Sequence, residues 1–267
     1  MTEPPVIVER EDHLLIVTLN RPEKRNAINS EMMCRLSDAW DLLDDEDALR
    51  VAILTGTGST FCAGMDLTEI GVLSRGEAAN EWMDRIRSDP DIVYRAWLKT
   101  HLPSKPVVLA VEGVARAGGI EILQGTDIRI AGSSALFGIT EVQRGLFPMA
   151  GSAVRLRRQI SYALAAEMLL CGDDITAQRA LEVGLINYVV PDGQAVAKAK
   201  AIASRIAANG PLAVKALVAT LHETESLREE TAYEIEQRYG LAVMASDDAR
   251  EGPRAFLEKR APVFNGR

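Results

Sequence analysis

Two glutamates and a glycine pair stand among small and apolar residues in the stretch "GVARAGGIEILQGTDIRIAGSSALFGITE", residues 113–141. The glycine pair follows an apolar run, so Gly118 is expected in the first turn of a helix, where the backbone N–H has no partner and the helix dipole adds positive charge. Glu121 lies three positions later, on the same helical face. This spacing predicts an N–H that grips an oxyanion beside a carboxylate, and Glu141 is a second carboxylate in similar surroundings.

A second turn with the same properties occurs at "FCAGMDL", which follows a short apolar run at residues 51–54. The turn through Ala63 and Gly64 can present the backbone N–H of Met65. Two N–H groups from two strand-to-helix turns make an oxyanion hole, so Met65 and Gly118 are the candidate donors.

Each of these features also has an ordinary structural interpretation. A glycine pair before a helix is often a tight turn. A lone helical glutamate such as Glu121 is more often solvated than buried. Glu141 can be a glutamate at a helix start, where the dipole favours it.

Other familiar kinds of site are not indicated. "GTGST" lacks the third glycine of a dinucleotide fingerprint, no Gly-Lys pair forms a P-loop, and no GxSxG elbow occurs. The three histidines have no second ligand at metal-binding spacing, so no metal is expected. The three cysteines are widely spaced, which favours a reducing compartment.

The surrounding pattern predicts an α/β fold that brings such turns together. Residues 6–9 and 14–19 read as a β-hairpin, and residues 51–54, 107–112, 127–131 and 135–138 as further strands. Ser30 is expected to cap a helix whose apolar stripe is Met33, Leu36, Trp40 and Leu43. Residues 68–99 are charge-rich without a clear period and are expected to form helix and mobile loop. The alternation of strand and helix implies right-handed crossovers.

The composition divides the chain near residue 192. Residues 1–191 are expected to form the core that holds the active site, and residues 192–267 a C-terminal helical subdomain. The later helices are amphipathic, which favours assembly between subunits.

The bulk properties narrow the function. A net charge of −8 argues against a nucleic-acid partner. The N-terminus has no signal-peptide pattern, and no apolar run reaches the length of a membrane span, so we expect a cytoplasmic protein without a membrane partner.

Taken in order, five motifs resemble those of the enoyl-CoA hydratase/isomerase family, the crotonase superfamily. They are "LNRPEKRNAIN", "AILTGTGSTFCAGMDL", "KPVVLAVEGVARAGGIEILQGTDIRIAG", "FGITEVQRGLFPMAGSAVRL" and "SDDAREGPRAFLEKRAPVF", and they span nearly the whole chain. The resemblance implies a crotonase-like spiral of ββα repeats with a C-terminal helical trimerisation subdomain. It also implies a homotrimer or a dimer of trimers.

The resemblance assigns roles by position. Met65 and Gly118 match the family's oxyanion donors, and Glu121 and Glu141 match its two glutamates. Hydratases of this family use both glutamates, whereas many other members lack one, so the implied reaction is hydration of a 2-trans-enoyl-CoA to the 3-hydroxyacyl-CoA. No cofactor is implied, because coenzyme A is part of the acyl-CoA substrate.

Further residues are implied to bind the substrate or its coenzyme A. They are Arg25, Ala63, Asp66, Leu67, Gly119, Met149 and Lys259. Cations for the phosphates are available in "RPEKR" (Arg21, Lys24, Arg25) and "EKR" (Lys259, Arg260), although either cluster can also be a solvated surface.

The chain departs from the family at Met65, Ala117 and Met149, where alanine, glycine and glycine are common. Met149 borders the implied water site, so its bulk is expected to reshape the acyl pocket, unless it packs into the core. These variants resemble an actinobacterial branch that handles bulky acyl groups, including steroid side chains.

Four other functions are open. Two carboxylates are also the catalytic pair of glycoside hydrolases, but the 5% aromatic content offers few platforms for sugars. An enoyl-CoA isomerase or another reaction of the family is possible on the same scaffold. A non-catalytic acyl-CoA binder would not need both glutamates. An RNA-binding relative would want a lysine-rich helix, where this chain has "DAWDLLDDED".

Overall fold

The computed structural model describes residues 3–75 and 80–267. Its centre is a six-stranded sheet in the order β1-β2-β3-β5-β7-β10, in which β1 and β2 pair antiparallel and the other neighbours pair parallel. The strands are β1 (Val6–Glu11), β2 (Leu14–Leu19), β3 (Val51–Gly56), β5 (Val107–Val111), β7 (Ile128–Gly132) and β10 (Tyr188–Val190). The hairpin and the three central strands expected from the sequence are confirmed.

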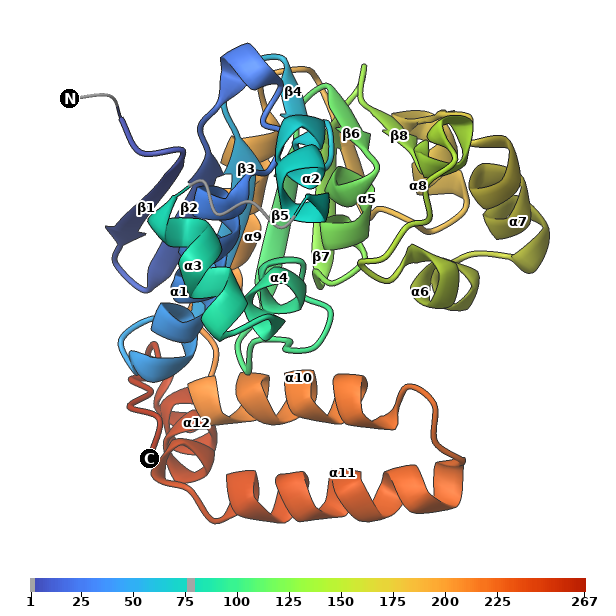
Figure 1. Ribbon diagram of the computed structural model, residues 1–267. Helices are drawn as coiled ribbons and strands as arrows, with labels where there is room; N and C mark the ends of the chain where they lie inside the picture. Colours follow the sequence, from blue (N-terminus) through green and yellow to red (C-terminus); the bar gives the residue numbers. More distant parts are fainter. Residues whose placement is uncertain (1–2, 76–79) are drawn as a thin grey trace.

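A second sheet of four short strands has the order β4-β6-β8-β9. Its strands are β4 (Thr60–Cys62), β6 (Val114–Arg116), β8 (Leu136–Gly138) and β9 (Ile175–Thr176). Three times along the chain a strand of the large sheet is followed by one of the small sheet and then by a helical turn: β3-β4-α2, β5-β6-α5 and β7-β8-η2. The repetition is the α/β spiral of ββα units that the resemblance implies (Figure 1).

The helices of the core all lie before residue 208. They are α1 (Ser30–Asp45), α2 (Leu67–Ser74), α3 (Glu81–Ser88), α4 (Asp91–Ala96), α5 (Gly118–Leu123), α6 (Ser152–Gln159), α7 (Tyr162–Cys171), α8 (Ala177–Glu182) and α9 (Ala195–Ala207), with 3₁₀ turns η1 (Pro22–Lys24) and η2 (Glu141–Arg144). Within the segment 68–99, α2, α3 and α4 are helical as expected, and residues 76–79 lie outside the described part of the chain.

The start of α1 differs by one residue from the sequence-based expectation. The side chain of Asn29, not Ser30, accepts the capping hydrogen bond from the Met32 N–H. Ser30 is instead the first helical residue, and its N–H donates to Glu69 of α2 at 2.6 Å. The two polar residues are adjacent and both are good caps, so only the direction of the incoming chain decides between them. The expected apolar stripe of α1 is buried.

Both faces of the large sheet are covered. Alternate residues of β2, β3 and β5, such as Leu15, Leu54 and Leu109, belong to the main core shared with the small sheet and α1. Their neighbours, such as Leu14, Ile53 and Val108, pack against α9 on the other face. Successive side chains of a strand point to opposite faces of the sheet, and here both faces are buried. These strands are therefore continuous apolar runs in the sequence.

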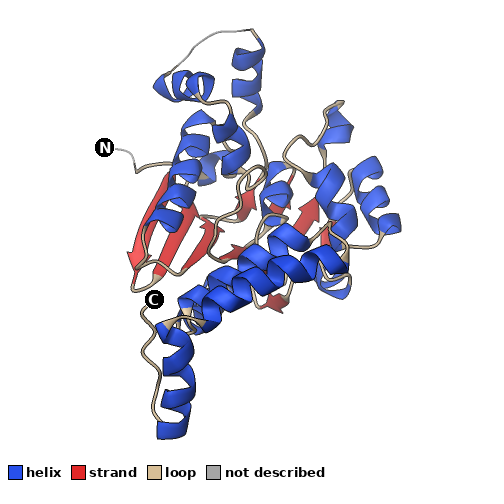
Figure 2. Cartoon of the chain, turned by 90° about the horizontal axis from the view of Figure 1, so that it is seen from below, coloured by secondary structure: helices blue, strands red, loops and turns tan. Residues whose placement is uncertain are grey.

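The helices after α9 are less enclosed. They are α10 (Pro211–Thr224), α11 (Glu229–Met244) and α12 (Asp247–Glu258). Helices α10 and α11 form an antiparallel pair beneath the core (Figure 1), and the helix nearest the C-terminus projects from the body (Figure 2). Because α9 packs on the sheet, the part of the chain that stands apart begins at α10; a division at residue 192 stays a prediction. No helix among the described residues has the length and hydropathy of a membrane span.

Candidate active site

The two turns predicted to carry the oxyanion donors lie against each other. Gly64 has a left-handed φ of +101°, and a Cβ placed on it would lie 2.7 Å from the Cβ of Ala117 and 3.2 Å from the backbone N of Gly118. Only a glycine allows this approach, because a side chain at residue 64 would force the turns apart. The chain thus brings the N–H groups of residues 65 and 118 to one place.

Neighbouring hydrogen bonds leave these two N–H groups free to face a ligand. Residues 63–66 run beside residues 25–28, where Ile28 donates to the Gly64 carbonyl and Asp66 donates to the Ile28 carbonyl. The Met65 N–H points away from this ladder. Gly118 is the first residue of α5, so its N–H has no intrahelical acceptor. Among the described residues, neither N–H donates to another backbone group.

A cavity of about 570 Å³ opens in front of these donors. Its walls include the sequence-predicted Arg25, Ala63, Met65, Asp66, Leu67, Gly118, Glu121, Glu141 and Met149. Gly119 and Lys259 do not line it. A Cβ on Gly119 would lie 2.5 Å from the Cys62 carbonyl, so this glycine lets α5 pack on β4. Lys259 is the exposed C-cap of α12.

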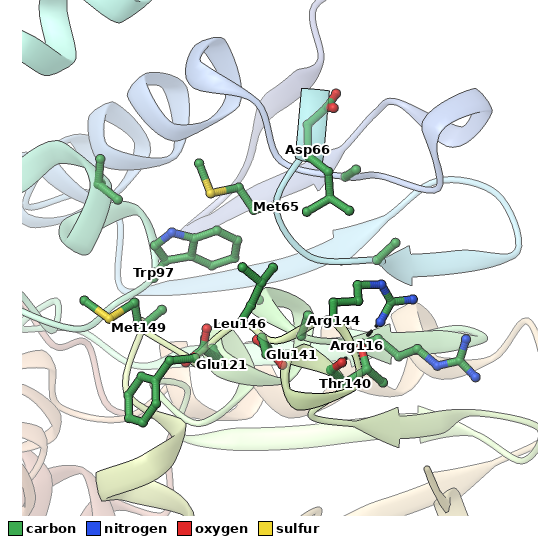
Figure 3. A pocket seen from close by; sticks show the side chains of 18 of the residues that line it. Met65, Asp66, Trp97, Arg116, Glu121, Thr140, Glu141, Arg144, Leu146 and Met149 are labelled. Carbon is green, nitrogen blue, oxygen red and sulfur yellow. Dashed lines mark hydrogen bonds between the residues drawn. The ribbon is translucent and has the colours of Figure 1, made fainter. Parts of the chain in front are cut away.

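The two glutamates lie on one side of the cavity and are both buried (Figure 3). Glu121 is 5% exposed and Glu141 is 9% exposed. Glu121 projects from α5 and accepts a hydrogen bond from the Ser152 N–H, at the start of α6, at 3.2 Å. Glu141 begins η2, and its Oε2 has no hydrogen-bond partner among the described residues. A buried carboxylate oxygen without a protein partner is suited to contact a substrate or its water.

Burial also sets the protonation of the pair. Removal from water raises the pKa of Glu121 to about 7, and the charge of Glu141 adds to this rise, while the backbone of Ser152 and Ala150 opposes it. Burial raises the pKa of Glu141 as well, against the opposing charge of Arg144. With the pKa of Glu121 at about 7 and that of Glu141 also raised, the site can hold one protonated and one ionised carboxyl, so that one donates a proton while the other accepts.

The cavity has an apolar end and a cationic end. Val93, Tyr94, Trp97, Leu146, Phe147 and Met149 supply apolar or aromatic surface. Lys24, Arg25, Arg116 and Arg144 supply positive charge. Figure 3 shows Trp97 and Met149 on one side, Arg116 and Arg144 on the other, and Met65, Glu121 and Glu141 between them. The donors and the carboxylates therefore stand between an apolar and a charged region.

Two of the cations expected to bind phosphate, Arg21 and Arg260, are engaged by other groups of the protein. Arg21 donates to the Ala27 carbonyl at 2.7 Å and to Asp66 Oδ2 at 3.2 Å, so it fastens the turn of Met65. Although partial burial opposes it, hydrogen bonds from Thr68 and Arg21 hold the pKa of Asp66 below its usual value. Arg260 pairs with Glu251 and Glu258 of α12. Lys24 and Arg25 are exposed at the cavity.

Sequence reasoning did not identify the apolar wall residues Val93, Tyr94, Leu146 and Phe147, nor Trp97, Arg116 and Arg144. Trp97 is 4% exposed and its indole packs on Gly118, but it comes from a segment without a helical or strand period. Arg116 and Arg144 each stand within one turn of a predicted site residue, which is the signal that could have identified them. Arg116 pairs with Asp174, with its Nε 2.9 Å from Oδ1, and Arg144 donates to the Thr140 carbonyl at 3.1 Å.

Comparison with known proteins agrees with this geometry. A family model described as enoyl-CoA hydratase/isomerase matches residues 9–267. The chain belongs to this family. It is similar to the enoyl-CoA hydratase EchA19 of Mycobacterium tuberculosis, with 52% identity over 99% of this chain and 97% of the relative. It is also similar to the mevalonyl-coenzyme A hydratase sidH of Aspergillus fumigatus, with 40% identity over 94% and 91% of the two chains.

The fold comparison gives the same result. A solved structure from Mycobacterium abscessus, described as a putative enoyl-CoA hydratase/isomerase, superposes with a TM-score of 0.89 and 43% identity, covering 98% of this chain and 100% of the other. The protein is therefore an enzyme of the enoyl-CoA hydratase type with the crotonase fold and mycobacterial relatives.

Proposed function

We propose that this protein adds water across the double bond of a 2-trans-enoyl-CoA and forms the 3-hydroxyacyl-CoA. The observation that carries the proposal is the pair of buried glutamates beside the Met65 and Gly118 N–H groups in one cavity. The thioester oxygen accepts from the two N–H groups, the acyl chain lies toward Trp97, and the phosphates of coenzyme A lie toward the cationic end.

The chemistry follows from the two kinds of group. Attack of water at the β-carbon pushes the electrons of the double bond toward the thioester oxygen, where the two N–H donors stabilise the developing charge. One glutamate takes the proton of the attacking water, and the pair delivers a proton to the α-carbon. Water is added as OH and H, so no oxidant, metal or other cofactor enters the balance.

The direct test is incubation with a 2-trans-enoyl-CoA. We expect the absorbance of the conjugated thioester to fall, and chromatography to show a product heavier by one water. An isomerase would instead turn a 3-enoyl-CoA into the conjugated 2-enoyl-CoA without a mass change. A non-catalytic binder would bind the thioester and leave its absorbance unchanged. Either result in place of hydration would refute the proposal.

Met149 is expected to determine which acyl groups fit. The side chain is 58% exposed and lines the cavity, so packing into the core does not account for it. In Met149→Gly, kcat/KM for short, long and branched enoyl-CoA substrates should change relative to one another, by roughly 1–3 kcal/mol per methylene group accommodated or lost. The melting temperature should change little, since few buried contacts are removed. An unchanged ranking of substrates would show that Met149 does not shape the acyl site.

We also propose that the enzyme assembles as a homotrimer or a dimer of trimers through its C-terminal helices. Large apolar side chains are exposed on all three: Leu217, Leu221, Leu241, Met244, Phe256 and Leu257. Exposed apolar groups of this size favour burial in a subunit interface. A double substitution, Phe256→Asp with Leu257→Asp, should give a smaller species by light scattering with an unchanged circular dichroism spectrum. An unaltered mass would place the interface elsewhere.

A further inference from the structure

The turn that holds Glu121 is itself fastened by one lysine outside the cavity. Residues 149–152 lead into α6 and end at Ser152, whose N–H donates to Glu121. Lys99 follows α4 and donates from Nζ to the Met149 carbonyl at 2.6 Å. On the other side of the turn, Arg155 of α6 donates from Nη2 to the Lys99 carbonyl at 3.2 Å. Lys99 thus contacts the chain on both sides of Ser152, at Met149 before it and at Arg155 after it.

The backbone of the residue before Lys99 has an unusual conformation that fixes where Lys99 lies. The preceding residue, Leu98, is fully buried and has a left-handed φ of 53°. A leucine is strained in this conformation, because its Cβ lies too close to the following carbonyl oxygen. It persists because Leu98 packs tightly on Gly125, where an added Cβ would lie 2.6 Å from the Leu98 Cβ. This one residue turns Trp97 toward Gly118 and Lys99 toward Met149.

The side chain of Lys99 is held in place at a second point. Its Nζ lies 4.4 Å from the centre of the Tyr94 ring, a cation–π contact. The tyrosine lines the apolar end of the cavity. A lysine fixed by a carbonyl and an aromatic ring has little rotamer freedom, so its charge stays at a defined place near the site.

The charges that face Glu121 come from three neighbouring segments. Glu141 from η2 is a like charge. Lys99 and Arg155, from the segment after α4 and from α6, are the opposite charges that act on Glu121. The positive charges thus come from Lys99 and Arg155, which do not line the cavity, whereas Glu141 lies on the cavity wall with Glu121.

We propose that Lys99 is a positioning residue for Glu121: it contacts the chain before and after Ser152, keeps the Ser152 N–H aimed at the carboxylate, and places a positive charge near Glu121 from outside the cavity. The inference rests on the proposed function in that Glu121 takes part in moving the proton. Lys99 touches neither the water nor the acyl group, and its effect passes through the turn and the charge.

Three variants separate these contributions. Lys99→Met removes the donor and the charge, Lys99→Gln keeps a donor without the charge, and Lys99→Arg keeps both. We expect kcat to fall about tenfold in Lys99→Met with little change in KM, since displacement of an acid–base group impairs the chemical step more than binding. Lys99→Arg should restore most of the activity. Lys198→Met is the matched control, because Lys198 also stacks on a tyrosine, Tyr188 at 4.6 Å, but lies on the surface of α9.

A second measurement does not depend on turnover. The carboxyl carbons of glutamate, labelled with ¹³C, report the titration of Glu121, which Glu121→Gln assigns by loss of its signal. The pKa of Glu121 should rise in Lys99→Met and Lys99→Gln, and should stay near the wild-type value in Lys99→Arg and Lys198→Met. The same order should appear in the pH profile of kcat/KM.

The outcomes are distinguishable. If the wild-type enzyme hydrates no enoyl-CoA but the titration of Glu121 shifts as described, the proposed function fails and the positioning role stands. If Lys99→Met leaves both the titration and kcat unchanged, the positioning role is wrong. It is also wrong if Lys99→Met and Lys99→Arg lose equal activity and melting temperature while Glu121 titrates normally, since Lys99 would then only stabilise the fold.

Discussion

Replacement of Glu121 or Glu141 with glutamine is expected to lower kcat for enoyl-CoA hydration by at least ~10²-fold while KM changes little, an effect typical of positioned acid–base groups. Glutamine has the size of glutamate, and at position 121 its amide oxygen still accepts from the Ser152 N–H, but at either position it neither takes nor gives a proton. Steady-state kinetics on both variants checks the expectation. Full activity in either one would remove that glutamate from the mechanism.

The stability of Glu121→Gln provides the control for this experiment. Burial raises the pKa of Glu121 from 4.5 to about 7, so between these values the folded chain binds this proton more tightly than the unfolded chain. The contribution of Glu121 to the free energy of unfolding therefore falls as the pH rises from 4.5 to 7. Glutamine does not ionise, so above pH 7 the variant should be more stable than the wild type, by roughly 2–3 kcal/mol.

Chemical denaturation at pH 5 and pH 8 measures this difference. A variant that has lost activity but gained stability at the higher pH has an intact fold, so the lost activity then belongs to the carboxylate. A variant less stable than the wild type at both values would mean that the substitution disturbs the site itself.

Gly118→Ala is expected to have the second large effect. A Cβ on Gly118 would lie 2.3 Å from Cη2 of Trp97, which is closer than real Cβ contacts, and the Trp97 residue is 4% exposed. We expect the start of α5 to shift away from the indole, and the N–H of residue 118 to shift with it. Loss of one oxyanion donor costs about 10²–10³-fold in kcat, so Gly118→Ala should fall in that range. The measurement is kcat with the substrate that the wild type prefers.

Two comparisons identify the cause. Gly240→Ala in α11 has open space around the added Cβ and should retain full activity, with a slight gain in helix stability. Placing Gly118→Ala in a Trp97→Phe background should reduce the loss, because phenylalanine lacks the far edge of the indole that the new Cβ meets. If the loss is the same in both backgrounds, contact with Trp97 is not its cause.

The sequence determined the local features of this protein. Short apolar runs predicted the strands β3, β5 and β7. The spacing of Gly118 and Glu121 predicted the first turn of α5 with its free N–H. Such features depend on residues a few positions apart, so propensity, capping and periodicity are enough to predict them. Even there, the sequence alone did not decide whether Asn29 or Ser30 caps α1, because that depends on the path of the preceding chain.

Only the tertiary structure decided which of these features meet. The contact of Gly64 with Ala117 and Gly118 depends on the parallel pairing of β4 with β6, and the joint burial of Glu121 and Glu141 depends on where η2 lies against the cavity. Three other contacts join segments twenty or more residues apart. Trp97 packs on Gly118, Arg21 pairs with Asp66, and Lys99 donates a hydrogen bond to the turn that contacts Glu121. Their partners are set by strand register and crossover direction, which are properties of the whole fold and leave no period in the sequence.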